Sequence, residues 1–147
     1  MKNKVDRYTA SFLLLICVAI IGACAQKAQL AEYKKYKDAS EVPKISVQDA
    51  KKEVDAGTAI IIDSRGDAAY KNERIAGSIS ISSATETDKV AKLPKDKKLI
   101  VYCSCATEGT SAALSFQLNQ AGIANTYALT GGTKAWHDAG YPMASGD

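Results

Sequence analysis

Short apolar runs alternate with segments of helical spacing along the chain beyond residue 43. Two continuous apolar runs, at residues 59–63 and 99–102, have the length and β-rich composition of strands buried on both faces of a parallel sheet. Shorter runs predict further strands at residues 44–46, within 75–81 and at 125–129. The segments between them predict helices at residues 47–56, 67–73, 85–93, 110–121 and 134–139. This alternation predicts an α/β fold with a mainly parallel central sheet of about five strands and helices on both faces.

The most informative stretch, residues 99–118, places a strand, a loop and a helix in immediate succession. The apolar run ends at Cys103, and helical spacing resumes at Thr110 or Ser111, either of which is a suitable N-cap. A loop between a strand end and a helix start directs backbone N–H groups at one point, where the helix adds partial positive charge. We call this arrangement the cradle, and a cysteine within it is biased toward the nucleophilic thiolate. Cys103 is therefore the candidate nucleophile, and the candidate substrate-binding loop comprises Ser104, Ala106, Thr107, Gly109, Thr110 and Ser111.

The N-terminus has the composition of an export signal. Three basic residues within the first seven positions precede an apolar run at residues 11–21, which is short for a transmembrane helix. The Ile-Gly-Ala-Cys sequence at residues 21–24 resembles the lipobox of bacterial lipoproteins. That resemblance implies cleavage before Cys24 and attachment of several acyl chains to it, which would anchor the protein durably. The alternatives are an uncleaved anchor, or an ordinary signal peptide with a coincidental cysteine.

These features divide the chain into three parts. We expect a lipoprotein signal peptide at residues 1–23, a lipidated N-terminus with a polar tether at 24–42, and a folded domain at 43–147. As a solvated coil the tether would reach about 25 Å. The expected location is the bacterial cell envelope, to which the exported protein would be anchored by lipid. Because alanine rather than aspartate follows Cys24, the resemblance implies the periplasmic face of the outer membrane if the host is Gram-negative.

Composition excludes several classes of function. The net charge of +3 falls close to zero once the basic signal peptide is removed, so we expect no nucleic-acid surface. Of four cysteines, Cys17 leaves with the signal peptide and Cys24 carries lipid. The remaining thiols, Cys103 and Cys105, cannot provide a disulfide framework for the fold. With His137 as the single histidine, they also make a poor zinc site, and we expect neither a metal nor another cofactor.

Four separated segments resemble the rhodanese-like domain family. They are a strand ending in Asp63-Ser-Arg65, the Gly77 segment at residues 74–81, the strand that delivers Cys103, and a Gly-Gly-x-x-x-Trp-x-x-x-Gly-x-Pro pattern at residues 131–142. They span about residues 44–143, which is nearly the whole predicted domain. The resemblance implies a three-layer rhodanese-like fold.

The resemblance also implies sulfur transfer. Cys103 would attack the sulfane sulfur of a small donor, hold it as a persulfide and pass it to a thiol or a cyanide-like acceptor. The predicted cradle suits both the thiolate and the anionic persulfide. From their positions, Asp63 is expected to hydrogen-bond loop amides, and Arg65 to orient the loop or to contact substrate. The membrane would be contacted through the lipid on Cys24, while a partner protein stays unknown.

Glu108 departs from the family pattern. Active single-domain members usually carry a basic residue in this loop, often an arginine five positions after the cysteine, and the loop is usually shorter than residues 103–111. A carboxylate about 7 Å from a thiolate opposes its ionisation by about 2 kcal/mol at an effective dielectric near 20. The cradle favours ionisation by a comparable amount. Glu108 therefore predicts that anionic donors such as thiosulfate are disfavoured, unless Arg65 pairs with it.

Cys105 is the second departure and leaves two functions open. Two residues from Cys103, it would act as a resolving thiol or as half of a redox pair in an oxidising exported location. It could equally be a small loop residue. The first hypothesis is a membrane-anchored sulfurtransferase, and the alternative is a weakly active or inactive binding or thiol-redox module that uses Cys103 and Cys105.

Overall fold

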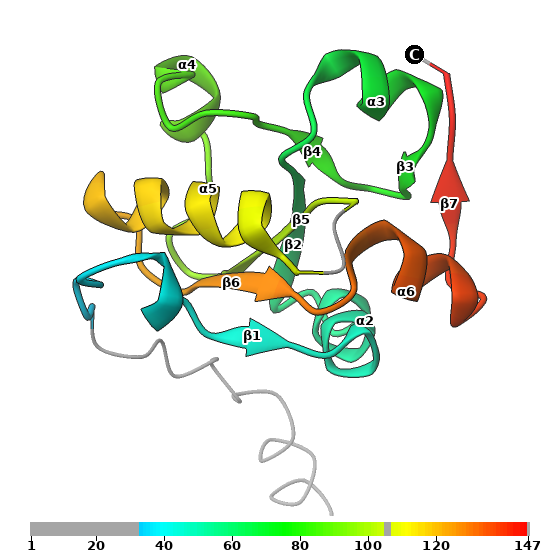
Figure 1. Ribbon diagram of the computed structural model, residues 1–147, viewed down its shortest axis with the longest axis horizontal. Coiled ribbons are helices and arrows are strands. Elements are labelled where there is room, and N and C mark those ends of the chain that lie inside the picture. The colour runs from blue at the N-terminus through cyan, green and yellow to red at the C-terminus, as the bar shows by residue number, and fades with distance from the viewer. Residues whose placement is uncertain (1–32, 105–106, 147) are drawn as a thin grey trace, which may run out of the picture.

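Five parallel strands form the centre of the domain (Figure 1). The computed structural model describes residues 33–104 and 107–146. Within these residues the strands lie in the order β1, β6, β5, β2, β4, and each neighbouring pair is parallel. Their bounds are β1 Lys44–Ile45, β2 Ala59–Asp63, β4 Ile79–Ser80, β5 Lys98–Tyr102 and β6 Thr126–Leu129. The α/β fold with a mainly parallel central sheet is thereby confirmed.

Helices lie on both faces of this sheet (Figure 1). The α-helices of the described residues are α2 Val47–Asp55, α3 Asp67–Asn72, α4 Thr87–Val90, α5 Gly109–Gln120 and α6 Gly132–Asp138. A separate antiparallel pair joins β3 (Arg74–Ile75) to β7 (Met143–Ala144). The three layers thus correspond to those expected from the alternating pattern.

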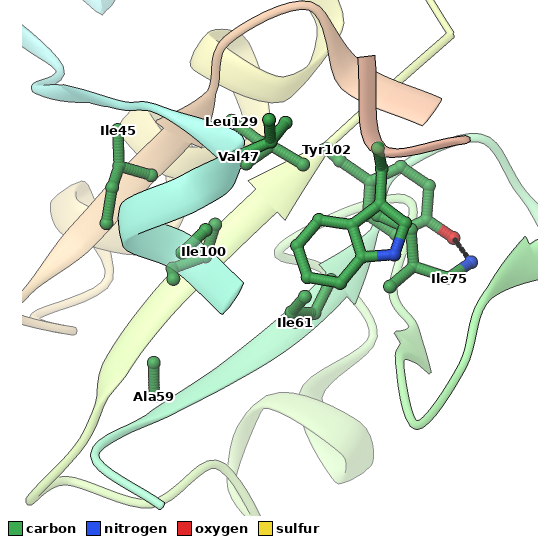
Figure 2. Close-up of a cluster of buried hydrophobic side chains, with 10 residues drawn as sticks. Ile45, Val47, Ala59, Ile61, Ile75, Ile100, Tyr102 and Leu129 are labelled. Atoms are coloured by element: carbon green, nitrogen blue, oxygen red, sulfur yellow. Dashed lines mark hydrogen bonds between the residues drawn. The ribbon is translucent and has the colours of Figure 1, made fainter. Parts of the chain in front are cut away.

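Successive side chains of the central strands enter two different cores. On one face, Ile61 and Ile100 pack with Trp136 of α6 and with α2 (Figure 2). On the other face, Ile62 and Val101 pack with the leucines of α5. Because neighbouring residues of a strand point to opposite faces, burial on both faces requires an unbroken apolar run. This is why β2 and β5 are recognisable in the sequence.

The shortest elements differ from the predicted ones. The helix expected at residues 85–93 is the single turn α4, which ends at Val90. After it, the N–H groups of Lys92 and Leu93 bond to carbonyls three residues back, and Pro94 cannot continue a helix. The two-residue strands β3 and β7 and the 3₁₀ helix η1 (Ala39–Glu41) are too short to leave a periodic signal.

Several predicted features lie outside the described residues. These are the signal peptide at 1–23, the lipidation site Cys24, and the loop residues Cys105 and Ala106. Within residues 33–104 and 107–146, no helix has the length and apolar character needed to cross a bilayer.

Residues 33–42, predicted as the second part of a solvated tether, lie against α5; we call this segment the strap. The buried Asn119 side chain accepts the N–H of Tyr36 at 2.8 Å and donates to the carbonyl of Lys34 at 2.9 Å. The Tyr33 hydroxyl donates to the Asn119 carbonyl at 2.8 Å. The tether pattern could not reveal this docking, because Asn119 bonds mainly to the strap's backbone, which carries no sequence signal.

Candidate active site

Cys103 follows β5 directly, at the carboxyl edge of the sheet where β5 lies between β2 and β6. Its carbonyl accepts the backbone N–H of Thr133 at 3.0 Å and the Thr133 hydroxyl at 3.3 Å. Its Sγ lies 3.7 Å from Oγ of Ser111. Only 1% of the residue is exposed. The first turns of α5 and α6 therefore meet at Cys103.

The start of α5 differs from the predicted one. The helix begins at Gly109, so Thr110 and Ser111 already lie in its first turn, and Glu108 occupies the N-cap position without a side-chain cap bond. Glu108 adopts a left-handed conformation with φ of 54°, which costs a non-glycine residue about 1 kcal/mol and must be maintained by surrounding contacts. The hydroxyl of Ser111 donates to the Glu108 carbonyl at 3.0 Å. Ser111 thus links this strained residue to the sulfur of Cys103.

Asp63 and Arg65 form a buried ion pair at the carboxyl end of β2. The Asp63 side chain is fully buried and accepts the backbone N–H of Arg65 at 2.9 Å. It also accepts Nε at 3.0 Å and Nη2 at 2.7 Å. The same guanidinium donates to the carbonyl of Glu73. Arg65 therefore ties the end of β2 to the residue that follows α3.

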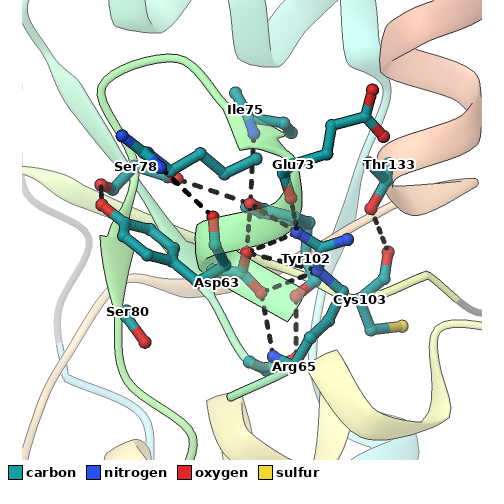
Figure 3. Close-up of polar contacts among 12 residues, drawn as sticks. Asp63, Arg65, Glu73, Ile75, Ser78, Ser80, Tyr102, Cys103 and Thr133 are labelled. Carbon is teal, nitrogen blue, oxygen red and sulfur yellow. Dashed lines mark hydrogen bonds and ion pairs between the residues drawn. The ribbon is translucent and has the colours of Figure 1, made fainter. Parts of the chain in front are cut away.

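The hydroxyl of Tyr102 completes this network (Figure 3). Tyr102 lies opposite Asp63 in the β2–β5 register, donates to its carboxylate and accepts the N–H of Ile75 at 3.2 Å. Burial and the bond to Asp63 raise the pKa of Tyr102 to about 12, so the hydroxyl remains a donor at neutral pH. The Cys103 side chain points away from this network (Figure 3). The network therefore fixes the end of β5, one residue before the candidate nucleophile.

The side chain of Glu108 reaches toward β1. Its Oε2 accepts from Lys44 Nζ at 2.7 Å, and its Oε1 accepts the backbone N–H of Gly131 at 2.9 Å. These two bonds lower the pKa of the Glu108 carboxyl. The pairing of Arg65 with Glu108, which the sequence left open, is not formed, because Arg65 bonds to Asp63, two residues before it. Lys44 supplies the compensating charge instead.

The other loop residues lie mainly at the surface. Ser104, Thr107, Gly109 and Thr110 are exposed, whereas Ser111 is buried. In the part of the chain that the structure describes, no three His, Cys, Asp or Glu side chains come together as a metal site would require.

A sequence model of the rhodanese-like domain matches residues 46–139, which is more than half of the chain. The chain belongs to the rhodanese-like domain family. The matched range contains the Asp63–Arg65 pair, Tyr102, Cys103 and Glu108.

Named relatives and solved structures agree with this membership. Thiosulfate sulfurtransferase GlpE of Pseudomonas savastanoi pv. phaseolicola is 30% identical over 84 residues, covering 57% of this chain and 76% of the relative. The protein of the same name from Shewanella oneidensis is 26% identical over 95 residues, covering 65% and 92%. A rhodanese-related protein from Thermoplasma volcanium aligns with a TM-score of 0.58 at 28% identity, covering 69% and 97%. The BH2092 protein from Bacillus halodurans, at 23% identity, shares the fold with a TM-score of 0.64 over 72% and 79% of the two chains. The rhodanese-like chain thus has a sulfurtransferase-family fold.

Sequence reasoning did not single out three residues that contact the rhodanese-like site. Tyr102 has a weak signal, a hydroxyl at the end of an otherwise apolar strand. Thr133 and Lys44 have none, because their contacts with Cys103 and Glu108 join segments that are distant in the chain.

Proposed function

We propose that this rhodanese-like protein is a membrane-anchored sulfurtransferase that carries sulfane sulfur as a persulfide on Cys103. The observation that supports the reaction most directly is the position of Cys103 beside the first turn of α5. Backbone N–H groups and the partial positive charge at a helix start favour a thiolate, and they favour the persulfide anion that replaces it. The names of the relatives, thiosulfate sulfurtransferases, support the same reaction class.

The proposed cycle has two displacement steps. The Cys103 thiolate attacks the sulfane sulfur of the donor, forming a new S–S bond, while the donor's own bond to that sulfur breaks and its electron pair leaves with the remainder. Thiosulfate would release sulfite, and a polysulfide would release a chain one sulfur shorter. A nucleophilic acceptor then attacks the outer sulfur and returns Cys103 as thiolate. Cyanide would leave as thiocyanate, and a thiol as a persulfide.

Lys44 bears on the choice of donor. An uncompensated Glu108 carboxylate would repel anions, but Glu108 bonds to Lys44 and to a backbone N–H. The net charge beside the loop is therefore smaller than the sequence suggests, and we infer that small anionic donors, polysulfide and thiosulfate, both remain candidates.

Intact-mass and peptide-mass measurements test the proposed reaction. The full chain, purified in detergent and reduced, is exposed separately to polysulfide and to thiosulfate. We expect an adduct of one sulfur atom on the peptide that contains Cys103, and its discharge by cyanide as thiocyanate. Absence of the adduct with both donors would contradict the proposal.

The membrane anchor is supported by the lipobox-like residues 21–24. Expressed in a bacterial host, the wild-type chain is expected in the membrane fraction, with its mature N-terminus at Cys24 carrying diacylglycerol and an acyl chain. Cys24→Ala is expected to remain unlipidated and uncleaved at that position. Mass spectrometry of the N-terminal peptide makes the comparison, and an unmodified Cys24 in the wild type would contradict lipidation.

The alternative is a weakly active or inactive binding or thiol-redox module that uses Cys103 and Cys105. The burial of Cys103 favours weak activity, because a covered thiol meets donors slowly. The same mass measurements distinguish the two. A Cys103–Cys105 disulfide without a sulfur adduct would support the redox module, and no modification would support a binding module.

A further inference from the structure

Glu108 contacts three parts of the fold that meet beside Cys103. Its carboxylate accepts from Lys44 of β1 and from the N–H of Gly131, just before α6. Its carbonyl accepts the hydroxyl of Ser111 in α5, and that hydroxyl lies 3.7 Å from Cys103 Sγ. A continuous path of contacts therefore runs from Lys44 through Glu108 and Ser111 to the sulfur.

One short turn also holds both ends of the segment between Cys103 and Glu108. Thr133 donates twice to the Cys103 carbonyl, while Gly131 donates to the Glu108 carboxylate. The turn is held against α6, because the Gly131 carbonyl accepts the Ala135 N–H at 3.1 Å. Only glycine fits at this position, since its φ is 73° and a Cβ there would meet the Ala135 Cβ at 2.6 Å. The Gly131 N–H is thus a fixed reference point against which the Glu108 carboxylate is placed.

The backbone conformation of Glu108 shows that these contacts constrain the chain before α5. Its left-handed backbone is unfavourable for a non-glycine residue, and such conformations persist where neighbouring contacts enforce them. The backbone of Glu108 in turn sets where α5 begins, and so where Ser111 and the first N–H groups of α5 stand relative to the sulfur.

We propose that Glu108 and Lys44 form a positioning pair that holds the first turn of α5 in the geometry Cys103 needs for sulfur transfer. The role rests on the proposed sulfurtransferase function. It assigns Glu108 to shaping the site through Ser111 rather than to contacting the donor. In this chain the loop carboxylate supports the nucleophile, instead of opposing its ionisation as the sequence alone predicts.

A double-mutant cycle tests the pair in the full chain. Glu108→Gln keeps an acceptor for the Gly131 N–H but loses the charge, Lys44→Met removes the cation, and the double variant removes both. Glu108→Ala removes the acceptor as well. The matched control is Glu53→Ala, because Glu53 likewise accepts from a lysine, Lys98, and from a second donor, Thr58, but at the opposite, amino end of β5.

Two readouts are needed. The first is steady-state transfer from polysulfide to cyanide, resolved into kcat and KM. The second is the rate at which iodoacetamide alkylates Cys103, measured by peptide mass spectrometry and divided by the rate for the same variant unfolded in denaturant. The alkylation rate does not depend on sulfur transfer, so it still reports on positioning if the wild-type chain carries no sulfur and the proposed function fails.

We expect Glu108→Ala to lower kcat about ten- to a hundredfold, as a misplaced reacting group does, with little change in KM. Alkylation should become faster, because a loosened first turn of α5 exposes the covered thiol. Glu108→Gln and Lys44→Met should each lower kcat several-fold, and the double variant should lower it no further, since both remove the same interaction. Glu53→Ala should destabilise the fold while leaving kcat within about twofold, as expected for a site remote from the reaction.

Three results would overturn the positioning role. They are an unchanged kcat and alkylation rate in Glu108→Ala, independent losses that multiply in the double variant, and a fall in kcat for Glu53→Ala equal to that for Glu108→Ala. The last result would assign the loss to general destabilisation.

Discussion

Cys103→Ser is expected to lower sulfur transfer by on the order of 10³-fold or more. A serine hydroxyl is not ionised at neutral pH and cannot hold sulfane sulfur as a persulfide. Its size is close to that of the thiol, so the contact with Ser111 should be retained, and the substitution leaves the backbone carbonyl that accepts from Thr133 in place. Thiocyanate formed from cyanide with each donor measures transfer, and circular dichroism checks the fold.

Cys105→Ser is the control for this variant. If Cys103 is the nucleophile, Cys105→Ser should still form a persulfide and transfer it, and a resolving role would appear as slower release of sulfide. Activity in Cys103→Ser equal to that of the wild type would assign the chemistry to another residue.

Asp63→Ala is expected to lower the free energy of unfolding by about 3–5 kcal/mol, as removal of one partner from a buried ion pair does. Arg65 would lose its main partner, and the Tyr102 hydroxyl would lose its acceptor. Urea denaturation followed by tryptophan fluorescence measures the change, since Trp136 is buried in one of the two cores. A loss below about 1 kcal/mol, the value for an ordinary exposed pair, would contradict the assigned role.

Tyr102→Phe is the matched variant. It keeps the ring and the Asp63–Arg65 pair but leaves the N–H of Ile75 without its acceptor, so a smaller loss of about 1–2 kcal/mol is expected. The pKa of Tyr102 is about 12 in the fold against about 10 in an unfolded chain. Its contribution is therefore complete below pH 10 and decreases as the pH rises toward 12. Tyr102→Phe should remove that part of the alkaline loss of stability, which the wild type retains.

The central sheet was predictable because β2 and β5, two of its three interior strands, are buried on both faces. That burial leaves continuous apolar runs at residues 59–63 and 99–102, and no other short segment of the domain has so clear a pattern. The family was predictable for a different reason, namely that four separated motifs occur in the right order. The position of Cys103 between a strand and a helix follows from the same two signals.

The electrostatics of the loop could not be predicted. Glu108 and its partner Lys44 are 64 positions apart, and the side chain could have turned toward Cys103, Arg65 or β1. Only the folded chain shows that β1 lies within its reach. The strap is a similar case, because Asn119 holds it through backbone groups of residues more than 80 positions away.

The docked strap also limits how far the domain can lie from the proposed lipid anchor. With Cys24 lipidated as proposed, eight positions, 25–32, lie between the lipid and the first residue of the strap, and eight residues span at most about 30 Å when fully extended. The strap contacts the domain near Asn119, at the C-terminal end of α5. The sulfur of Cys103 lies beside Ser111, in the first turn of the same helix. Ser111 and Asn119 are eight residues apart in the helix, which corresponds to about 12 Å along its axis. The strap thus places the proposed membrane attachment at one end of α5 and leaves the thiol beside the other end.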